Sequence, residues 1–124
     1  MRESLLYLGG ALIIVWGTAH LFPTKKVVAG FGRITRDSQM VLTMEWIAEA
    51  ILLIFGGALV VLMTARFGVG ATATQTVAAA AASMLLVLAA VSALTGGRVD
   101  FIIYRLCAPI FTFSAALILV GAFA

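Results

Sequence analysis

Apolar residues follow one another along this chain in four long runs, and short polar segments separate the runs. The runs extend over residues 5–22, 41–64, 73–94 and 101–123. About 20 consecutive apolar residues are enough for one helix to cross the ~30 Å hydrocarbon core of a bilayer. The pattern therefore predicts an all-α integral membrane four-helix bundle that forms one domain over residues 1–124.

The composition of the chain supports this class. Hydrophobic residues make up 64% of the sequence and charged residues only 10%. A soluble domain is closer to half apolar and a quarter charged. We therefore exclude a soluble globular domain, and the few residues outside the four runs leave no room for a separate soluble module.

The segment between the first and second runs, TKKVVAGFGRITRD, has its own pattern. Helical spacing puts Val27, Phe31 and Ile34 on one side, which predicts a short amphipathic helix lying in the membrane interface. Gly30 and Gly32 favour the alternative, an irregular loop with solvated charges. In either case we expect headgroup contact from the basic residues Lys25, Lys26, Arg33 and Arg36.

The basic residues are divided unevenly between the two ends of the predicted helices. Arg2 and Arg66 lie at one end, and the other six of the eight lie in or beside the loops after the first and third runs. Cytoplasmic loops carry an excess of Lys and Arg. We therefore expect these two loops in the cytoplasm and both termini outside. Because the charges form no broad basic face, we expect no nucleic-acid partner.

Two carboxylates interrupt the second run, in the stretch MEWIAEA. Glu45 and Glu49 are four residues apart, so they project from one face of the helix. Leu52 and Gly56 continue that face, and the glycine indicates that it meets another helix. An acidic side chain at the middle of a bilayer costs ~3 kcal/mol, so both carboxylates need partners, protons or water.

Polar residues from the first, second and fourth runs lie at similar depths. At a rise of ~1.5 Å per residue, they all fall within roughly the first 12 Å from the cytoplasmic ends of the helices. We predict an ion pair between Arg105 and Glu45, because their levels match. Glu49 is deeper and has no cation at its level, so we expect it to carry a proton, and we expect His20 to donate to a carboxylate or to reach the headgroups. The predicted polar cluster comprises His20, Trp16, Glu45, Glu49, Tyr104 and Arg105.

The same residues also fit purely structural roles. An Arg105–Glu45 pair locks two helices together, and a neutral Glu49 bonds a backbone carbonyl. Trp46 and His20 are typical of interfacial anchors. The small residues of the four runs predict a tight bundle with few large voids.

The chain carries no catalytic signature, so we expect it not to be an enzyme on its own. Cys107 is the only cysteine and His20 the only histidine, so we expect no metal site and no internal disulfide. We expect Cys107 to be a small buried apolar residue.

Three functions fit the predicted cluster. The first is a site for a lipophilic ligand, a lipid or a quinone, because His and a protonatable Glu suit a quinone carbonyl. The second is a proton-coupled small transporter, which with so few helices requires a homo-oligomer. The third is an accessory subunit of a larger membrane complex.

Two stretches resemble a known family. WGTAHLFPTKKV, followed after a loop by EWIAEAILLIFGGALVVLMTARFG, is similar to the DoxX-like group of small bacterial four-helix membrane proteins. The resemblance implies a bundle in the bacterial inner membrane, with Glu45 or Glu49 at the acidic position of the second helix. It also implies links to quinone-coupled sulfur oxidation or redox-stress complexes, and hence a subunit of a quinone-coupled membrane oxidoreductase as an alternative function.

Overall fold

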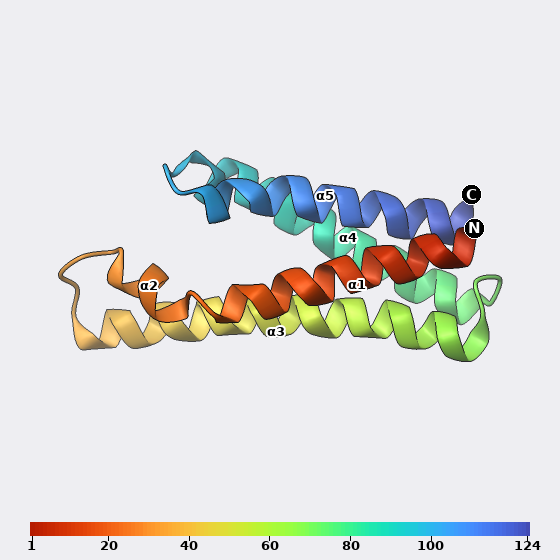
Figure 1. The fold of residues 1–124 in the computed structure, drawn as a ribbon, viewed down its shortest axis with the longest axis horizontal. Helices are drawn as coiled ribbons and strands as arrows, with labels where there is room; N and C mark the ends of the chain where they lie inside the picture. Colours follow the sequence, from red (N-terminus) through yellow and green to blue (C-terminus); the bar gives the residue numbers. More distant parts are fainter.

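The computed structural model describes residues 1–124, and its main elements are four long antiparallel helices (Figure 1). They are α1 (Arg2–Leu21), α3 (Arg36–Phe67), α4 (Thr72–Leu94) and α5 (Ile102–Phe123). All four are long and apolar enough to cross a membrane, and the chain forms no strand. The predicted all-α membrane bundle is confirmed, and the chain is a multi-pass membrane protein.

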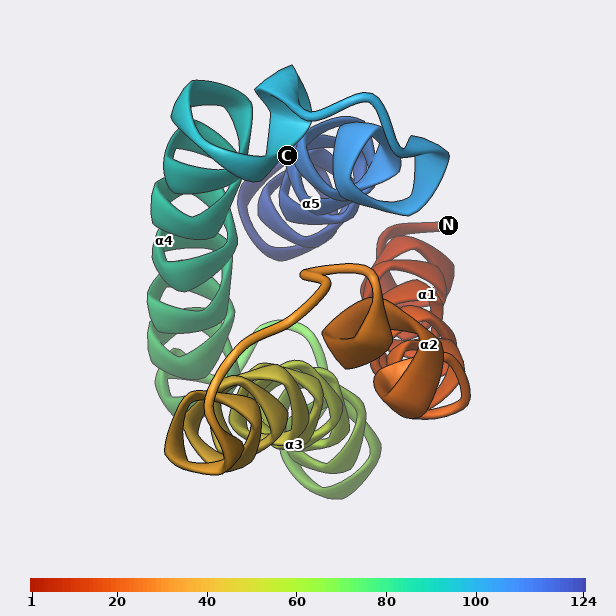
Figure 2. The same ribbon diagram turned by 90° about the vertical axis from the view of Figure 1, so that its left-hand side faces the viewer.

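Viewed end-on, the four helices surround a common axis in the order α1, α3, α4, α5 (Figure 2). The helix pairs α1–α3 and α4–α5 make the most extensive contacts, α1 and α5 make fewer, and α3 and α4 fewer still. The helices α3 and α5 lie diagonally opposite each other, and their backbones hardly approach each other anywhere. Side chains on α3 and α5 therefore face each other only across the interior.

The two ends of the bundle differ in structure. The loop end holds Leu21, Arg36, Leu94 and Ile102, and the terminus end holds the first and last residues of the chain (Figure 1). At the terminus end α1 and α5 lie close together. Toward the loop end the α1–α3 and α4–α5 pairs diverge (Figure 1).

Glycines allow the close approach of α1 to its neighbours, as the sequence predicted. A Cβ atom built on Gly57 would lie 2.5 Å from the carbonyl oxygen of Gly10. One built on Gly9 would lie 2.7 Å from a side-chain carbon of Ile118. Neither distance leaves room for a methyl group, so these backbones approach as closely as only glycine permits.

Polar side chains tie the terminus end together. The Arg2 guanidinium donates to the carbonyl oxygens of Gly121 and Ala122, at 3.3 and 2.6 Å. These are carbonyls of the last turn of α5, which lack donors within their own helix. Thr74 Oγ1 of α4 donates to the Met63 carbonyl of α3 at 3.1 Å. The terminus end is therefore closed by hydrogen bonds that join α1 to α5 and α4 to α3.

The loop end is open. A cavity of about 760 Å³ lies there, between the diverging helix pairs. The prediction of a tight bundle with few large voids is therefore wrong at this end. The helices pack closely only at levels where glycines let their backbones meet. On α1 the glycine contact nearest the loop end is that of Gly17 with Ile54 and Ala50.

The segment after α1 forms a shorter helix than predicted. The helix α2 (Thr24–Ala29) ends before Gly32, whose φ of 75° lies in the left-handed region and cannot continue a helix. Val27 and Val28 are buried and line the cavity, so the apolar side of α2 faces the bundle. The four basic residues of the segment are exposed.

The helix α3 begins five residues before the predicted boundary, with Thr35 as its N-cap. The Thr35 hydroxyl accepts a hydrogen bond from the Ser38 backbone N–H at 3.1 Å. With 32 residues, α3 is ~48 Å long, which exceeds the ~30 Å hydrocarbon core. Opposite its first turns, a short 3₁₀ helix, η1 (Gly96–Arg98), joins α4 to α5.

Candidate functional site

The cavity at the loop end is the candidate site. Its wall is formed by 18 residues from α1, α2, α3, α4, α5 and the connections between them, and 12 of these are hydrophobic. Ligand sites are typically concave, ~300–1,000 Å³ in volume, and mostly apolar with a few placed polar groups. The cavity matches this description; its polar groups come from His20, Glu45, Glu49, Ser92 and Thr95, together with the hydroxyl of Tyr104, which is one of the 12 hydrophobic residues.

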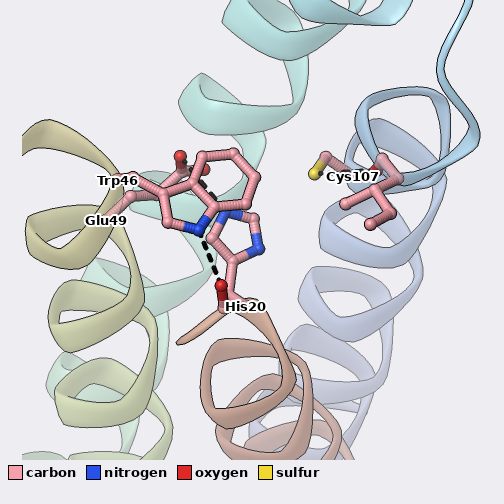
Figure 3. Close-up of polar contacts among 5 residues, drawn as sticks. His20, Trp46, Glu49 and Cys107 are labelled. Atoms are coloured by element: carbon pink, nitrogen blue, oxygen red, sulfur yellow. Dashed lines mark hydrogen bonds and ion pairs between the residues drawn. The ribbon is translucent and has the colours of Figure 1, made fainter. Parts of the chain in front are cut away.

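His20 enters this wall from the last turn of α1 and is only 2% exposed. Its ring stacks on the indole of Trp46, with centroids 3.9 Å apart and an interplanar angle of 16° (Figure 3). Trp46 Nε1 donates to the His20 backbone carbonyl at 2.7 Å. This carbonyl is in the last turn of α1, where no donor of the same helix is available, so the indole N–H supplies the missing partner.

Glu49 is the acidic neighbour of this histidine. Its Oε2 lies 3.6 Å from His20 Nε2, and its side chain is 31% exposed (Figure 3). That separation is an ion-pair distance but too long for a hydrogen bond. Neither ring nitrogen of His20 has a hydrogen-bond partner in the protein. Because buried polar groups are nearly always hydrogen-bonded, this pair of nitrogens is an exception that needs an explanation.

The helix α5 contributes an aromatic ring and a thiol. Tyr104 meets the edge of the Trp46 indole with centroids 5.7 Å apart and planes at 90°. Cys107 is buried one turn later, and its thiol donates to the Ile103 carbonyl at 3.4 Å. Figure 3 shows Cys107 pointing from α5 toward His20 and Trp46. The predicted burial of Cys107 is confirmed, and the thiol also lines the cavity.

The predicted ion pair between Arg105 and Glu45 is wrong. Arg105 instead pairs with Asp100, with Nη2 and Oδ1 3.1 Å apart, and donates from Nε to the Val99 carbonyl at 3.2 Å. Its side chain is 52% exposed and does not line the cavity. The matching depth was not sufficient, because Glu45 lines the cavity whereas Arg105 lies on a side of α5 that does not. Glu45 is exposed on the cavity wall without an ion pair.

Trp16 lies beside the site and does not line the main cavity. It borders a smaller cavity of about 260 Å³ between α1 and α5, which His20 also lines. Its indole centroid is 6.3 Å from that of His20, and its Nε1 is buried without a hydrogen-bond partner. His20 thus lies between two cavities, and each cavity is lined by a side chain whose buried nitrogen atoms have no hydrogen-bond partner.

The sequence analysis interpreted Trp46 as an interfacial anchor and left it out of the polar cluster. As an interfacial anchor it would be exposed, but it is 8% exposed and packs between His20 and Tyr104. The alternative role of His20 as an anchor is wrong for the same reason. The sequence did indicate that Trp46 belongs to the site, because Trp46 precedes Glu49 by three residues and therefore lies on the same helix face.

Comparison of the chain with protein-family models, with curated proteins and with solved structures finds no match. No three His, Cys, Asp or Glu side chains gather closely enough to hold a metal ion. The groups that the cavity wall offers are an imidazole, two carboxylates, a thiol, hydroxyls and aromatic rings, set among apolar side chains.

Proposed function

We propose that this membrane protein binds a small lipophilic molecule with a polar head group, the class to which lipids and quinones belong, in the loop-end cavity. One observation carries the proposal: His20 is 2% exposed, lines the cavity, and has two ring nitrogens without hydrogen-bond partners. Leaving a buried polar group unpaired costs ~1–3 kcal/mol. A ligand that bonds this imidazole removes that cost.

The rest of the cavity fits such a molecule. An apolar body would pack against Leu52, Leu88 and Val91, and the head group would lie near His20 and Glu49. An imidazole N–H or a protonated carboxyl can donate to a carbonyl oxygen, and either can transfer a proton. The extra length of α3 at this end suggests that the cavity lies where hydrocarbon meets headgroups, which gives a lipophilic molecule direct access.

The proposal includes a cellular setting. The excess of basic residues at the loop end favours a cytoplasmic location for the cavity, with both termini outside. The DoxX-like resemblance favours the bacterial inner membrane. A homo-oligomer or a larger membrane complex would supply any redox partner, because the proposal assigns ligand binding alone to this chain.

Fluorescence of Trp46 tests the proposal. The chain has two tryptophans, so Trp16→Phe leaves Trp46 as the only indole, stacked on His20 in the cavity wall. We expect decylubiquinone, which quenches indole fluorescence on contact, to quench Trp46 saturably in detergent micelles. His20→Leu should weaken this binding about tenfold, because it removes the buried hydrogen-bonding group.

The control moves the reporter to the other end of the bundle. A variant with Trp16→Phe, Trp46→Phe and Phe123→Trp carries its only indole at the exposed end of α5. Here we expect only the weak, linear quenching that arises from partition of the quinone into the micelle. Equal quenching of the two reporters, or saturable binding that is unchanged by His20→Leu, would contradict the proposal.

A further inference from the structure

We infer that the head group taken by this cavity is a cation, so that its ligand is a lipophilic monocation such as a protonated fatty amine or an organic onium ion. The inference rests on the proposed function and narrows its ligand class. The charges on the cavity wall are its first support. Glu45 and Glu49 are acidic, His20 alone can become positive, and no Lys or Arg lines the cavity.

The sign of this charge does not depend on where one proton resides. Without an added proton, the His20–Glu49 pair carries −1, and with one proton on either partner it carries zero. Glu45 adds −1 in both cases, so the wall carries −2 or −1. The cavity is therefore negative in a chain whose net charge is +3.

The basic residues near the loop end do not neutralise the cavity. Arg105 is paired with Asp100 outside it. Lys25 and Lys26 are exposed, whereas the valines that follow them on α2 face inward. The acidic wall and the basic exterior are therefore separated, and Glu45 is left without an ion pair although basic residues surround this end of the bundle.

The apolar surroundings strengthen the attraction for a cation. Low-dielectric walls with charge of one sign focus the electric field, and charges interact more strongly there than in water. Trp46, Tyr104 and Phe31 add aromatic rings to the wall, and the ring faces of such residues attract cations. A protonated amine would also donate a hydrogen bond to an unprotonated nitrogen of His20.

Other head groups fit this wall less well. A phosphate or carboxylate would face two carboxylates with no Lys or Arg to receive it. A neutral quinone carbonyl would satisfy His20, but it would leave Glu45 without a counter-ion. Only a cation balances the charge of the unpaired carboxylate, and a protonated amine also completes a hydrogen bond of the imidazole.

Two ions of the same shape and opposite charge provide the test. We would measure binding of tetraphenylphosphonium and of tetraphenylborate by equilibrium dialysis against the protein in dodecyl maltoside, subtracting protein-free micelles. We expect saturable binding of one tetraphenylphosphonium per chain that weakens as salt is added. We expect no saturable binding of tetraphenylborate.

Charge-neutralising variants assign the binding to the cavity. Glu45→Gln and Glu49→Gln should each weaken tetraphenylphosphonium binding about tenfold. Glu3→Gln removes the same charge from an exposed position at the terminus end and should change nothing. Because Glu45 is exposed and unpaired, Glu45→Gln should fold normally, and its helical circular dichroism should be unchanged.

The outcomes separate this inference from the proposed function. If decylubiquinone binds saturably and tetraphenylphosphonium does not, the cation inference is overturned and the proposed function stands. Equal binding of the two ions, or unchanged cation binding by the variant carrying both glutamines, also overturns the inference. If none of the three probes binds saturably, both the inference and the proposed function are overturned.

Discussion

The two ends of this bundle use similar apolar helices to different effect. At the terminus end, glycines bring α1 against α3 and α5, and the Arg2 guanidinium satisfies the carbonyls of the last turn of α5. At the loop end, α1 stops at Leu21 and the helix pairs diverge around a cavity of about 760 Å³. Close packing in a membrane therefore depends on the positions of the smallest residues, because apolar content is similar throughout.

The two ends also differ in how their polar groups are satisfied. At the terminus end, Arg2, Thr74 and Gln75 all donate to backbone carbonyls of neighbouring helices. Three of the four buried side-chain atoms without partners belong to His20 and Trp16 at the loop end, and the fourth is Ser114 Oγ. Unpaired groups of this kind are expected at a site that completes its hydrogen bonds with a ligand.

The largest effect should come from adding the same bulk at both ends. Ala122→Phe places a large ring at a fully buried position of the terminus end, and we expect it to destabilise the fold by about 3 kcal/mol through overpacking. Ala48→Phe places the same ring on the cavity wall, and we expect a stability change of less than ~0.5 kcal/mol together with loss of decylubiquinone binding. Thermal unfolding followed by circular dichroism measures both. Equal destabilisation by the two substitutions would erase the contrast between the ends.

A smaller effect should follow from removing the indole that connects α3 to α1. Trp46→Phe keeps a ring against His20 but leaves the His20 carbonyl without its donor. We expect a loss of about 1.5 kcal/mol, the typical cost of a buried hydrogen bond. The same denaturation measurement applies, with Trp16→Phe as the control, because Trp16 Nε1 makes no hydrogen bond. A larger loss in the control than in Trp46→Phe would count against the structural role given to Trp46.

The smallest effect should come from the charges that the sequence paired wrongly. Glu45→Gln and Arg105→Met should each change stability by less than ~0.5 kcal/mol, because one residue is unpaired and the other pairs at the exposed surface. Their effects should also add, because the two residues do not touch. A coupling energy above ~1 kcal/mol in the double variant would restore the Arg105–Glu45 pair and remove the free carboxylate from the cavity.

Much of the candidate site could be predicted from the sequence. Spacing along α3 placed Glu45 and Glu49 on one face, and depth counting placed them at the same end as His20 and Tyr104, which the cavity wall brings together. The same spacing places Trp46 on this face, because it lies three residues before Glu49. The structure buries Trp46 there, although tryptophan usually prefers the membrane interface. The residue type alone was not a reliable guide, because the indole ring can pack in the interior and donate its N–H to a buried carbonyl as well as to a headgroup.

The four membrane helices, the close packing at small residues and the concentration of polar residues at one end all follow from the sequence. These depend on hydrophobicity and spacing along single helices, which are local properties. The diagonal arrangement of α3 and α5, the pairing of Arg105 with Asp100 and the opening of the loop end into a cavity are seen only once the helices are packed together. Depth specifies one coordinate of a side chain, whereas contact also requires the order and divergence of the helices around it.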